Sequence, residues 1–333
     1  MNPDTLTQHL GSEIDDPDEE TFVLFSQDIP SGNLGFIDPR ASALDLTIAG
    51  RDLTIHQSPA VLSSNRPGGT TGAVVWKVTP VFAEWVSSPA NLLFRTGALS
   101  RRSAVLELGC GISAVVGLAL APSVSTYVLT DQAYVARLVE QNIEENRGAC
   151  FPPLPPLSSK KTASASSSSS SSKSRARPAR QQQHAAAAAS SSFSSSLLGD
   201  RIRFVPLDWE TDEVTAAALL SPSADQTSFD AVIACDCIYN EALIAPLVQT
   251  CVDGCRLRRP PGRNEEEEEE EDAGGPPTVC IVAQQLRDSG VFEAWIRHFH
   301  EAFRVWRVPD AELPDRLGPG SGFVVHIGIL RDT

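Results

Sequence analysis

The chain has 333 residues, 42 acidic against 27 basic side chains, and a formal net charge of −15. No apolar run reaches the roughly 18 residues that a membrane span needs, and the first twenty residues lack the basic start and apolar core of a secretion signal. The acidic balance argues against nucleic acid as a partner and is compatible with a basic protein substrate. The seven cysteines lie mostly in apolar runs, so we expect reduced thiols and a cytoplasmic protein, with the nucleus as a second compartment.

Two tracts contain too few apolar side chains to join a packed core. Residues 151–199 are mainly Ser, Ala, Pro and Gln, and residues 257–277 contain an unbroken acidic run, Glu265–Asp272. We predict that both are disordered inserts, and that residues 1–20 are a disordered tail. The Ser-rich insert contributes +6 and the acidic run Glu265–Asp272 contributes −8 to the total of −15, which leaves −13 on the rest of the chain. About 240 residues remain, a length that suits one α/β domain.

Residues 21–103 are expected to form an extension ahead of the main sheet. Ala43–Ile48 and Asp52–His56 alternate apolar and polar side chains across a short Gly-containing link, which favours a β-hairpin. A Gly-Thr loop follows, and the apolar spacing after it predicts a helix with Trp76 near its start. A lone Trp at such a place fits core packing as well as contact with a ligand.

The main domain is expected at residues 104–330, and its first part carries the clearest pattern. Ala104–Asp131 contains an apolar run, the turn Gly109-Cys110-Gly111, an Ala-rich helix, and a second apolar run that ends on an acid. This order is typical of the first half of a nucleotide-binding α/β sheet. The glycines let the backbone approach a ligand closely, and Asp131 is placed to hold both hydroxyls of a ribose.

Further elements follow in alternation. We predict a helix to about Arg147 and then, in order, strands at 201–207 and 229–235, a helix at 242–255, a strand at 278–283, a helix at 289–302, and strands at 303–308 and 322–330. With the two strands of the opening segment this gives a seven-stranded α/β sheet with helices on both faces. The last two strands have no helix between them, which fits a sheet whose last strand is antiparallel.

Chemistry-bearing side chains stand at the ends of these strands, where ligands bind in open α/β sheets. Asp208 can accept a hydrogen bond from an exocyclic amine while the Trp209 indole packs on the base, a pair that suits adenine. The spacing from Gly109 to Ala114 also satisfies a loose dinucleotide fingerprint. Against that, Glu107 opens the turn, where it would repel a pyrophosphate and suit a cationic ligand such as S-adenosylmethionine. We therefore favour a methyltransferase over an NAD-dependent oxidoreductase.

The ordered motifs resemble a known family. They are Trp76 after Thr71-Gly72, the ELGCG turn, Thr130-Asp131, Leu207-Asp208-Trp209 and Cys235-Asp236-Cys237-Ile238-Tyr239. The set resembles the class I, seven-β-strand methyltransferases that modify lysines in proteins. The segments DQAYVARLVEQNIEEN and FDAVIACDCIYNEALIAPLVQTC are similar to a fungal group that methylates ribosomal proteins. Asp236-x-x-Tyr239 is the motif most specific to the lysine-modifying branch, and the two inserts depart from the compact family pattern.

The resemblance implies S-adenosylmethionine as the cofactor and assigns its contacts. The implied cofactor-binding residues are Trp76, Glu107, Gly109, Cys110, Gly111, Asp131, Asp208, Trp209 and Cys235. Asp236 and Tyr239 are the candidate catalytic residues. Asp236 would attract and orient the lysine, and Tyr239 would form a wall of the channel that the lysine enters. The competing interpretation is that Asp236 caps the following helix and that Tyr239 only packs.

The implied acceptor is a lysine of a ribosomal or other translation-related protein, and we expect a monomer that binds neither nucleic acid nor membrane. We expect no metal, because the cysteine pairs lack accompanying Cys or His ligands at zinc spacing. Two alternatives stay open. One is a small-molecule methyltransferase or oxidoreductase on the same sheet, and the other is a non-catalytic binding module, against which the complete set of cofactor residues weighs.

Overall fold

The computed structural model describes residues 3–30, 35–66, 69–152, 201–220, 226–258 and 276–331. The two predicted inserts lie almost entirely outside the described residues. Within the described ranges, no helix is long and apolar enough to cross a membrane.

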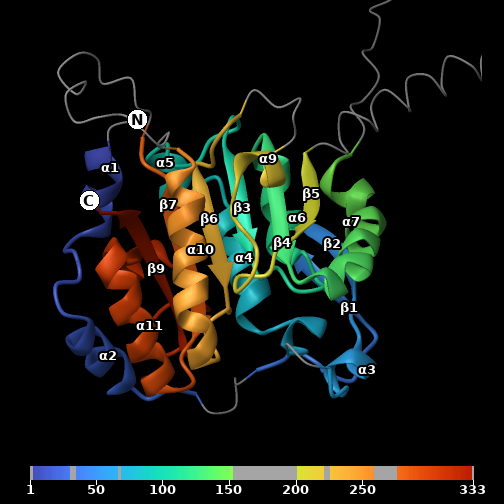
Figure 1. Cartoon of the computed structure of the whole chain (residues 1–333), viewed down its shortest axis with the longest axis horizontal. Coiled ribbons are helices and arrows are strands. Elements are labelled where there is room, and N and C mark those ends of the chain that lie inside the picture. Colours follow the sequence, from blue (N-terminus) through green and yellow to red (C-terminus); the bar gives the residue numbers. More distant parts are fainter. Residues whose placement is uncertain are drawn as a thin grey trace, which may run out of the picture.

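A seven-stranded sheet forms the centre of the molecule (Figure 1). Its strands, in the spatial order β5-β4-β3-β6-β7-β9-β8, are β5 (Ile202–Pro206), β4 (Thr126–Asp131), β3 (Ala104–Leu108), β6 (Ala231–Cys235), β7 (Val279–Gln285), β9 (Phe323–Leu330) and β8 (Phe303–Arg307). The first five run parallel, and β9 is antiparallel to both of its neighbours. The predicted fold class is confirmed, including the antiparallel last strand.

Helices cover both faces of the sheet because its central strands are apolar on both sides. All residues of β3, β6 and β7 are buried. On one face, Val105 and Ile233 join α4 (Val78–Ser87), α6 (Val115–Leu120) and α7 (Ala136–Cys150). On the other face, Leu106 and Val232 join α10 (Ile244–Arg256) and α11 (Ser289–Ala302) (Figure 1). Successive strand residues therefore enter opposite cores, as the pleat requires.

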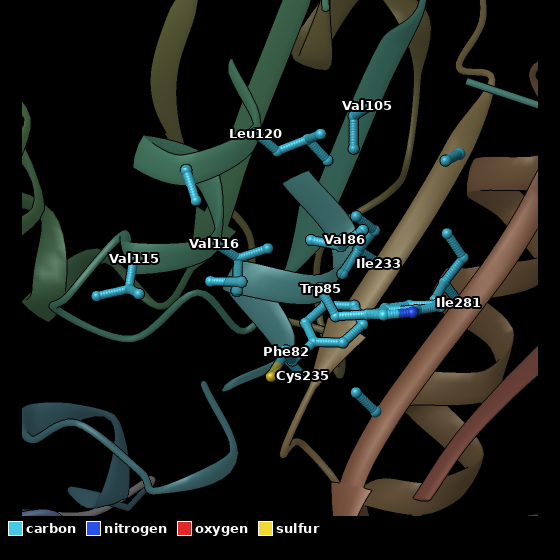
Figure 2. Packing of buried hydrophobic residues seen from close by; sticks show 14 of the residues in the cluster. Phe82, Trp85, Val86, Val105, Val115, Val116, Leu120, Ile233, Cys235 and Ile281 are labelled. Atoms are coloured by element: carbon cyan, nitrogen blue, oxygen red, sulfur yellow. The ribbon is translucent and has the colours of Figure 1, made fainter. Parts of the chain in front are cut away.

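Helix α4 fixes the first of these cores to the strands. Phe82, Trp85 and Val86 project from α4 toward Ile233 and Ile281, side chains of β6 and β7 (Figure 2). Phe82 and Val86 are fully buried. Because Trp76 lies two residues before α4, this packing also fixes the position of the Trp76 backbone.

The hairpin is present as expected, with β1 (Ala43–Ile48) antiparallel to β2 (Arg51–His56). Short helices α3 (Pro59–Leu62), α5 (Leu92–Arg95) and α9 (Ala216–Leu219) complete the described chain together with 3-10 turns. The Ala-rich helix expected after the glycine turn is short, because Ala114 has φ +53 and α6 begins only at Val115.

The prediction of a disordered tail at residues 1–20 is wrong for the described residues. Two helices form there, α1 (Pro3–Leu10) and α2 (Pro17–Phe25), and Leu6 and Leu10 are buried. Asp16 caps α2 by accepting hydrogen bonds from the Asp18 and Glu19 amides. The prediction rested on the acidic composition of this segment. It therefore did not use the N-cap signal of Asp16 or the four-residue spacing of Leu6 and Leu10. The division of the chain at residue 104 stays a sequence-based description, since hairpin residues and sheet residues share one hydrophobic cluster.

Candidate functional site

A cavity of about 400 Å³ opens at the carboxyl ends of the strands. Its lining contains all of the residues that the sequence proposes for cofactor or acceptor: Trp76, Glu107, Gly109, Cys110, Gly111, Asp131, Asp208, Trp209, Cys235, Asp236 and Tyr239. These residues come from five separate stretches of the chain. Four stretches lie at the ends of parallel strands, which bring them together at one edge of the sheet, and Trp76 reaches the same edge from the segment before α4.

The two glycine positions of the turn after β3 leave no room for a side chain. Gly109 and Gly111 have φ +66 and +59. A Cβ on Gly109 would lie 2.6 Å from Cys237 Sγ and 3.0 Å from the Trp209 ring, and one on Gly111 would lie 3.0 Å from the Gly72 carbonyl oxygen. The glycines therefore serve both the backbone conformation and the close packing of the cavity wall.

Asp131, at the end of β4, is held by backbone amides. Its Oδ2 accepts from Gly111 N at 2.9 Å and its Oδ1 from Gln132 N at 2.7 Å. Burial raises the pKa of the Asp131 carboxyl to about 6, although both amide bonds oppose the rise. Each oxygen keeps a second lone pair, so the carboxylate can accept two more hydrogen bonds from a ligand.

The predicted adenine end contains a donor without a protein partner. The Trp209 indole N–H is buried and makes no hydrogen bond to any described residue. Asp208 Oδ2 accepts from Gln132 Nε2 at 3.1 Å, and Arg66 donates to the Gln132 side-chain oxygen at 3.3 Å. Sequence reasoning did not single out Gln132, which connects the turn after β4 to Asp208. Its only signal was its place directly after Asp131.

Glu107 lies at the end of β3 and is almost inaccessible. Its Oε2 accepts a 2.7 Å hydrogen bond from the Tyr127 hydroxyl. Burial raises the pKa of Glu107 to about 7, and the nearby Asp131 charge adds to the rise. A cation bound in the cavity would favour the ionised form of this carboxyl.

Asp236, another lining residue of the cavity, does not cap a helix. The 3-10 turn before α10 (Glu241–Leu243) is capped by Asn240, whose side-chain oxygen accepts from Ala242 N. The Asp236 side chain is 1% exposed, and both of its oxygens accept from Arg287. Tyr239 is 38% exposed and lines the cavity, so it does not serve as a core residue. The competing interpretation of both residues is therefore contradicted.

Trp76 is fixed by three contacts. Its indole N–H donates to the Thr71 carbonyl at 3.1 Å, and its ring lies 4.4 Å from the Phe36 ring and 4.4 Å from the Arg287 guanidinium carbon. Such fixation prepares an aromatic wall for a ligand without further loss of side-chain entropy on binding.

The cysteines of the site are neutral thiols. Burial raises the pKa of Cys110, Cys235 and Cys237 well above the ordinary value. All seven cysteines are buried and unpaired. The described part of the chain contains no group of three or more His, Cys, Asp or Glu side chains arranged to hold a metal ion.

Comparison with known proteins relates part of the chain to a family. Residues 56–152 match the model of the lysine methyltransferase family. The matched residues include Trp76, the glycine turn and Asp131, and the resemblance seen in the motifs is confirmed.

Curated relatives are similar over part of their length. The chain is 31% identical over 233 residues to ribosomal lysine N-methyltransferase 5 of Saccharomyces cerevisiae, covering 60% of each protein. It is 29% identical over 222 residues to the protein of the same name from Zygosaccharomyces rouxii, covering 60% of this chain and 59% of that one. A Schizosaccharomyces pombe protein named diaminohydroxyphosphoribosylamino-pyrimidine deaminase is 30% identical over 139 residues, covering 41% of this chain and 33% of that protein. The chain thus spans at most about three fifths of these relatives.

Proposed function

We propose that the protein transfers a methyl group from S-adenosylmethionine to a lysine side chain of a protein. The observation that carries the proposal is that one cavity, beside the family domain, is lined by both the cofactor motifs and the Asp236-x-x-Tyr239 motif. When bound, S-adenosylmethionine supplies an electrophilic methyl group.

The residues of the cavity fit this cofactor from end to end. Asp131 has lone pairs left for two ribose hydroxyls, and the unpartnered Trp209 N–H and the Asp208 carboxylate stand at the adenine end. Glu107 complements a positive charge. A pyrophosphate would place two negative charges against that carboxyl, which argues against NAD.

The acceptor end has to receive a lysine as a neutral amine, because only the free lone pair attacks a methyl group. A lysine in water has a pKa near 10.4, so the site must favour loss of a proton and exclude water. We assign the acceptor walls to Tyr239 and Asp236, with the Asp236 carboxylate orienting the amine. Trp76, which the resemblance assigns to the cofactor, would be a wall that the cofactor and the acceptor share. Tyr239 lies at the exposed end of the cavity, where a long side chain from another protein can enter.

For the acceptor, we propose a lysine of a ribosomal or other translation-related protein, modified in the cytoplasm or nucleus by a monomeric enzyme. Two of the relatives carry a ribosomal-methylation name. The net charge of −15 also favours basic partners, and ribosomal proteins are such partners.

The test is incubation of the protein with isotope-labelled S-adenosylmethionine and a ribosomal-protein extract, followed by mass spectrometry. Label on a lysine of one extract protein would support the proposal, and label only on small molecules would favour the small-molecule methyltransferase. Thermal-shift measurements with S-adenosylhomocysteine and with NAD separate the cofactor classes. Stabilisation by NAD alone would reject the proposal, and cofactor binding without any transfer would favour a binding module.

A further inference from the structure

Arg287 is a second residue of the acceptor end that the motifs do not reveal. It lies between β7 and α11, and its Nη1 donates to Asp236 Oδ1 at 2.8 Å while its Nη2 donates to Asp236 Oδ2. The Arg287 side chain is 21% exposed and does not line the cavity itself. Any effect it has on a ligand must therefore pass through its neighbours.

Those neighbours are two walls of the cavity. The guanidinium pairs with Asp236 and also lies over the Trp76 ring, with its carbon 4.4 Å from the ring centre. Nη2 further donates to Gln285 Oε1 at 3.2 Å, and that oxygen accepts from Gly35 N at 3.1 Å. The planar guanidinium of Arg287 thus connects the ends of β6 and β7 with residues 35 and 76 of the N-terminal extension. Arginine can do this because its several N–H donors have a fixed geometry.

The pair also holds an unfavourable backbone conformation. Asp236 has φ +60, a region that non-glycine residues rarely occupy. Two charge-assisted hydrogen bonds from a planar fork fix both the position and the rotation of the carboxylate at the end of β6. Without Arg287, the side chain would be a nearly inaccessible anion with one remaining 3.3 Å bond, from Gln285 N.

Charge compensation changes what Asp236 can do to an incoming lysine. An unpaired buried carboxylate would stabilise the ammonium form and so withhold the lone pair that methyl transfer needs. A carboxylate paired with arginine exerts a much weaker field and still has lone pairs that accept a hydrogen bond from a neutral amine.

We propose that Arg287 is a positioning residue that holds Asp236 and Trp76 as one charge-compensated wall, so that the acceptor lysine is received as an amine. The inference rests on the proposed function. It replaces the picture in which Asp236 anchors the ammonium directly.

The test compares Arg287→Gln, Arg287→Lys, Asp236→Asn and the double variant Asp236→Asn/Arg287→Gln with the wild type. Asparagine suits position 236 because it tolerates positive φ better than most residues. Apparent kcat and KM are measured with total ribosomal protein as the varied acceptor, and S-adenosylhomocysteine affinity is measured by calorimetry on the same samples.

We expect Arg287→Gln to lower kcat at least tenfold, with KM unchanged or lower and with cofactor affinity within twofold of wild type. Arg287→Lys should retain more activity than Arg287→Gln, because lysine keeps the positive charge although it lacks the planar guanidinium that binds both carboxylate oxygens. The kcat of the double variant should be at most about twofold below that of the less active single variant, since both substitutions disrupt the same ion pair.

A matched control lies at the other end of the same strand. Asp230, just before β6, pairs with Arg258 at 2.7 Å, and Arg258 is about as exposed as Arg287, at 18% against 21%. Arg258→Gln removes a comparable ion pair far from the cavity, and it should leave kcat and KM unchanged.

Four results would overturn the inference. They are wild-type kinetics in Arg287→Gln, a loss of cofactor affinity as large as the loss of kcat, independent effects in the double variant, and an equal loss in Arg258→Gln. Absence of transfer by the wild type would instead reject the proposed function, and the inference with it. Wild-type transfer with unaffected Arg287 variants rejects the inference alone.

Discussion

At the scale of single residues, we propose that Asp131 controls whether the cavity can hold a ribose. The substitution Asp131→Asn keeps the shape but loses the charge-assisted hydrogen bonds, each of which contributes about 1.5–3 kcal/mol. We expect S-adenosylhomocysteine to bind at least tenfold more weakly, as measured by calorimetry at pH 7.5. Unaltered affinity would contradict the ribose assignment.

Asp131 also predicts a pH dependence of cofactor binding. Its pKa is about 6 in the free protein, so the carboxylate is mostly ionised at pH 7 and mostly protonated at pH 5. Because a ribose needs the ionised form, S-adenosylhomocysteine affinity should fall about tenfold from pH 7 to pH 5. Glu107, with a pKa of about 7, acts in the same direction over the same pH range and adds to the fall. In Asp131→Asn the tenfold share of Asp131 should disappear, and a fall from pH 7 to pH 5 as large as that of the wild type would remove Asp131 as a source.

The sequence predicts residues of this kind well when they end strands. Asp131, Asp208 and Asp236 each follow an apolar run, and the rule for parallel sheets places their side chains at one edge. Arg287 and Gln132 could not be found in that way. Their roles depend on which distant side chain they meet, and Arg287 reaches Asp236 across 51 positions of the chain.

At the scale of elements, α7 holds the hairpin through two buried asparagines. Asn142 accepts from His56 N at 2.7 Å and donates to the His56 and Ile112 carbonyls at 2.9 and 2.7 Å. Asn146, one turn later, makes the same paired bonds with the Thr54 backbone. The two amides thus take the place of a neighbouring strand for β2 and connect it to the turn that precedes α6.

Asn142→Ala should therefore destabilise the protein more than a single hydrogen bond would suggest. The change leaves three backbone groups without a side-chain partner, and each buried unsatisfied group costs about 1–3 kcal/mol. We expect the free energy of unfolding in urea to fall by about 3 kcal/mol, with weaker cofactor binding because the Ile112 carbonyl is released. Glu140→Gln, on the exposed side of α7, is the control. A loss below about 0.5 kcal/mol in Asn142→Ala would show that water replaces the asparagine without cost.

Element prediction succeeded and failed for identifiable reasons. Long apolar runs such as β6 and β7 are buried on both faces and are unambiguous in sequence. The helices α1 and α2 were missed because residues 1–20 are polar and acidic as a whole. Asn142 and Asn146 lie four apart in a helix, on the face that also carries Val139 and Ile143, which signals a buried polar contact but not its partner.

At the scale of the whole molecule, a buried polar cluster joins the first helices to the far edge of the sheet. Glu20 on α2 accepts a 2.9 Å hydrogen bond from His326 on β9, and Arg307 on β8 lies 3.6 Å from the same carboxylate oxygen. His326 is fully buried and Glu20 is 7% exposed. Burial alone would raise the pKa of Glu20, but the hydrogen bond and charge of His326 and the charge of Arg307 outweigh it and lower the pKa below its ordinary value of 4.5.

This cluster predicts how stability changes with pH. A carboxyl whose pKa is lowered by folding stabilises the protein above its unfolded pKa, and that contribution is lost as the pH falls through the folded value, below 4.5. Glu20→Gln should lower the free energy of unfolding by about 2 kcal/mol at pH 7, because the histidine and arginine lose a charged partner. The same substitution should cost much less at pH 3.5, where the wild-type carboxyl begins to take up a proton.

The measurement is urea unfolding of the wild type, Glu20→Gln and Glu19→Gln at both pH values. Glu19 is the neighbouring, exposed residue of α2, so it reports any general effect of removing one negative charge from this helix. A cost of Glu20→Gln that stays constant between pH 7 and 3.5 would contradict the linkage, and an equal cost in Glu19→Gln would assign the effect to net charge. The acidic start of the chain is thus a part of the folded domain, because Glu20 connects α2 through β8 and β9 to the same sheet whose other strand ends form the cavity.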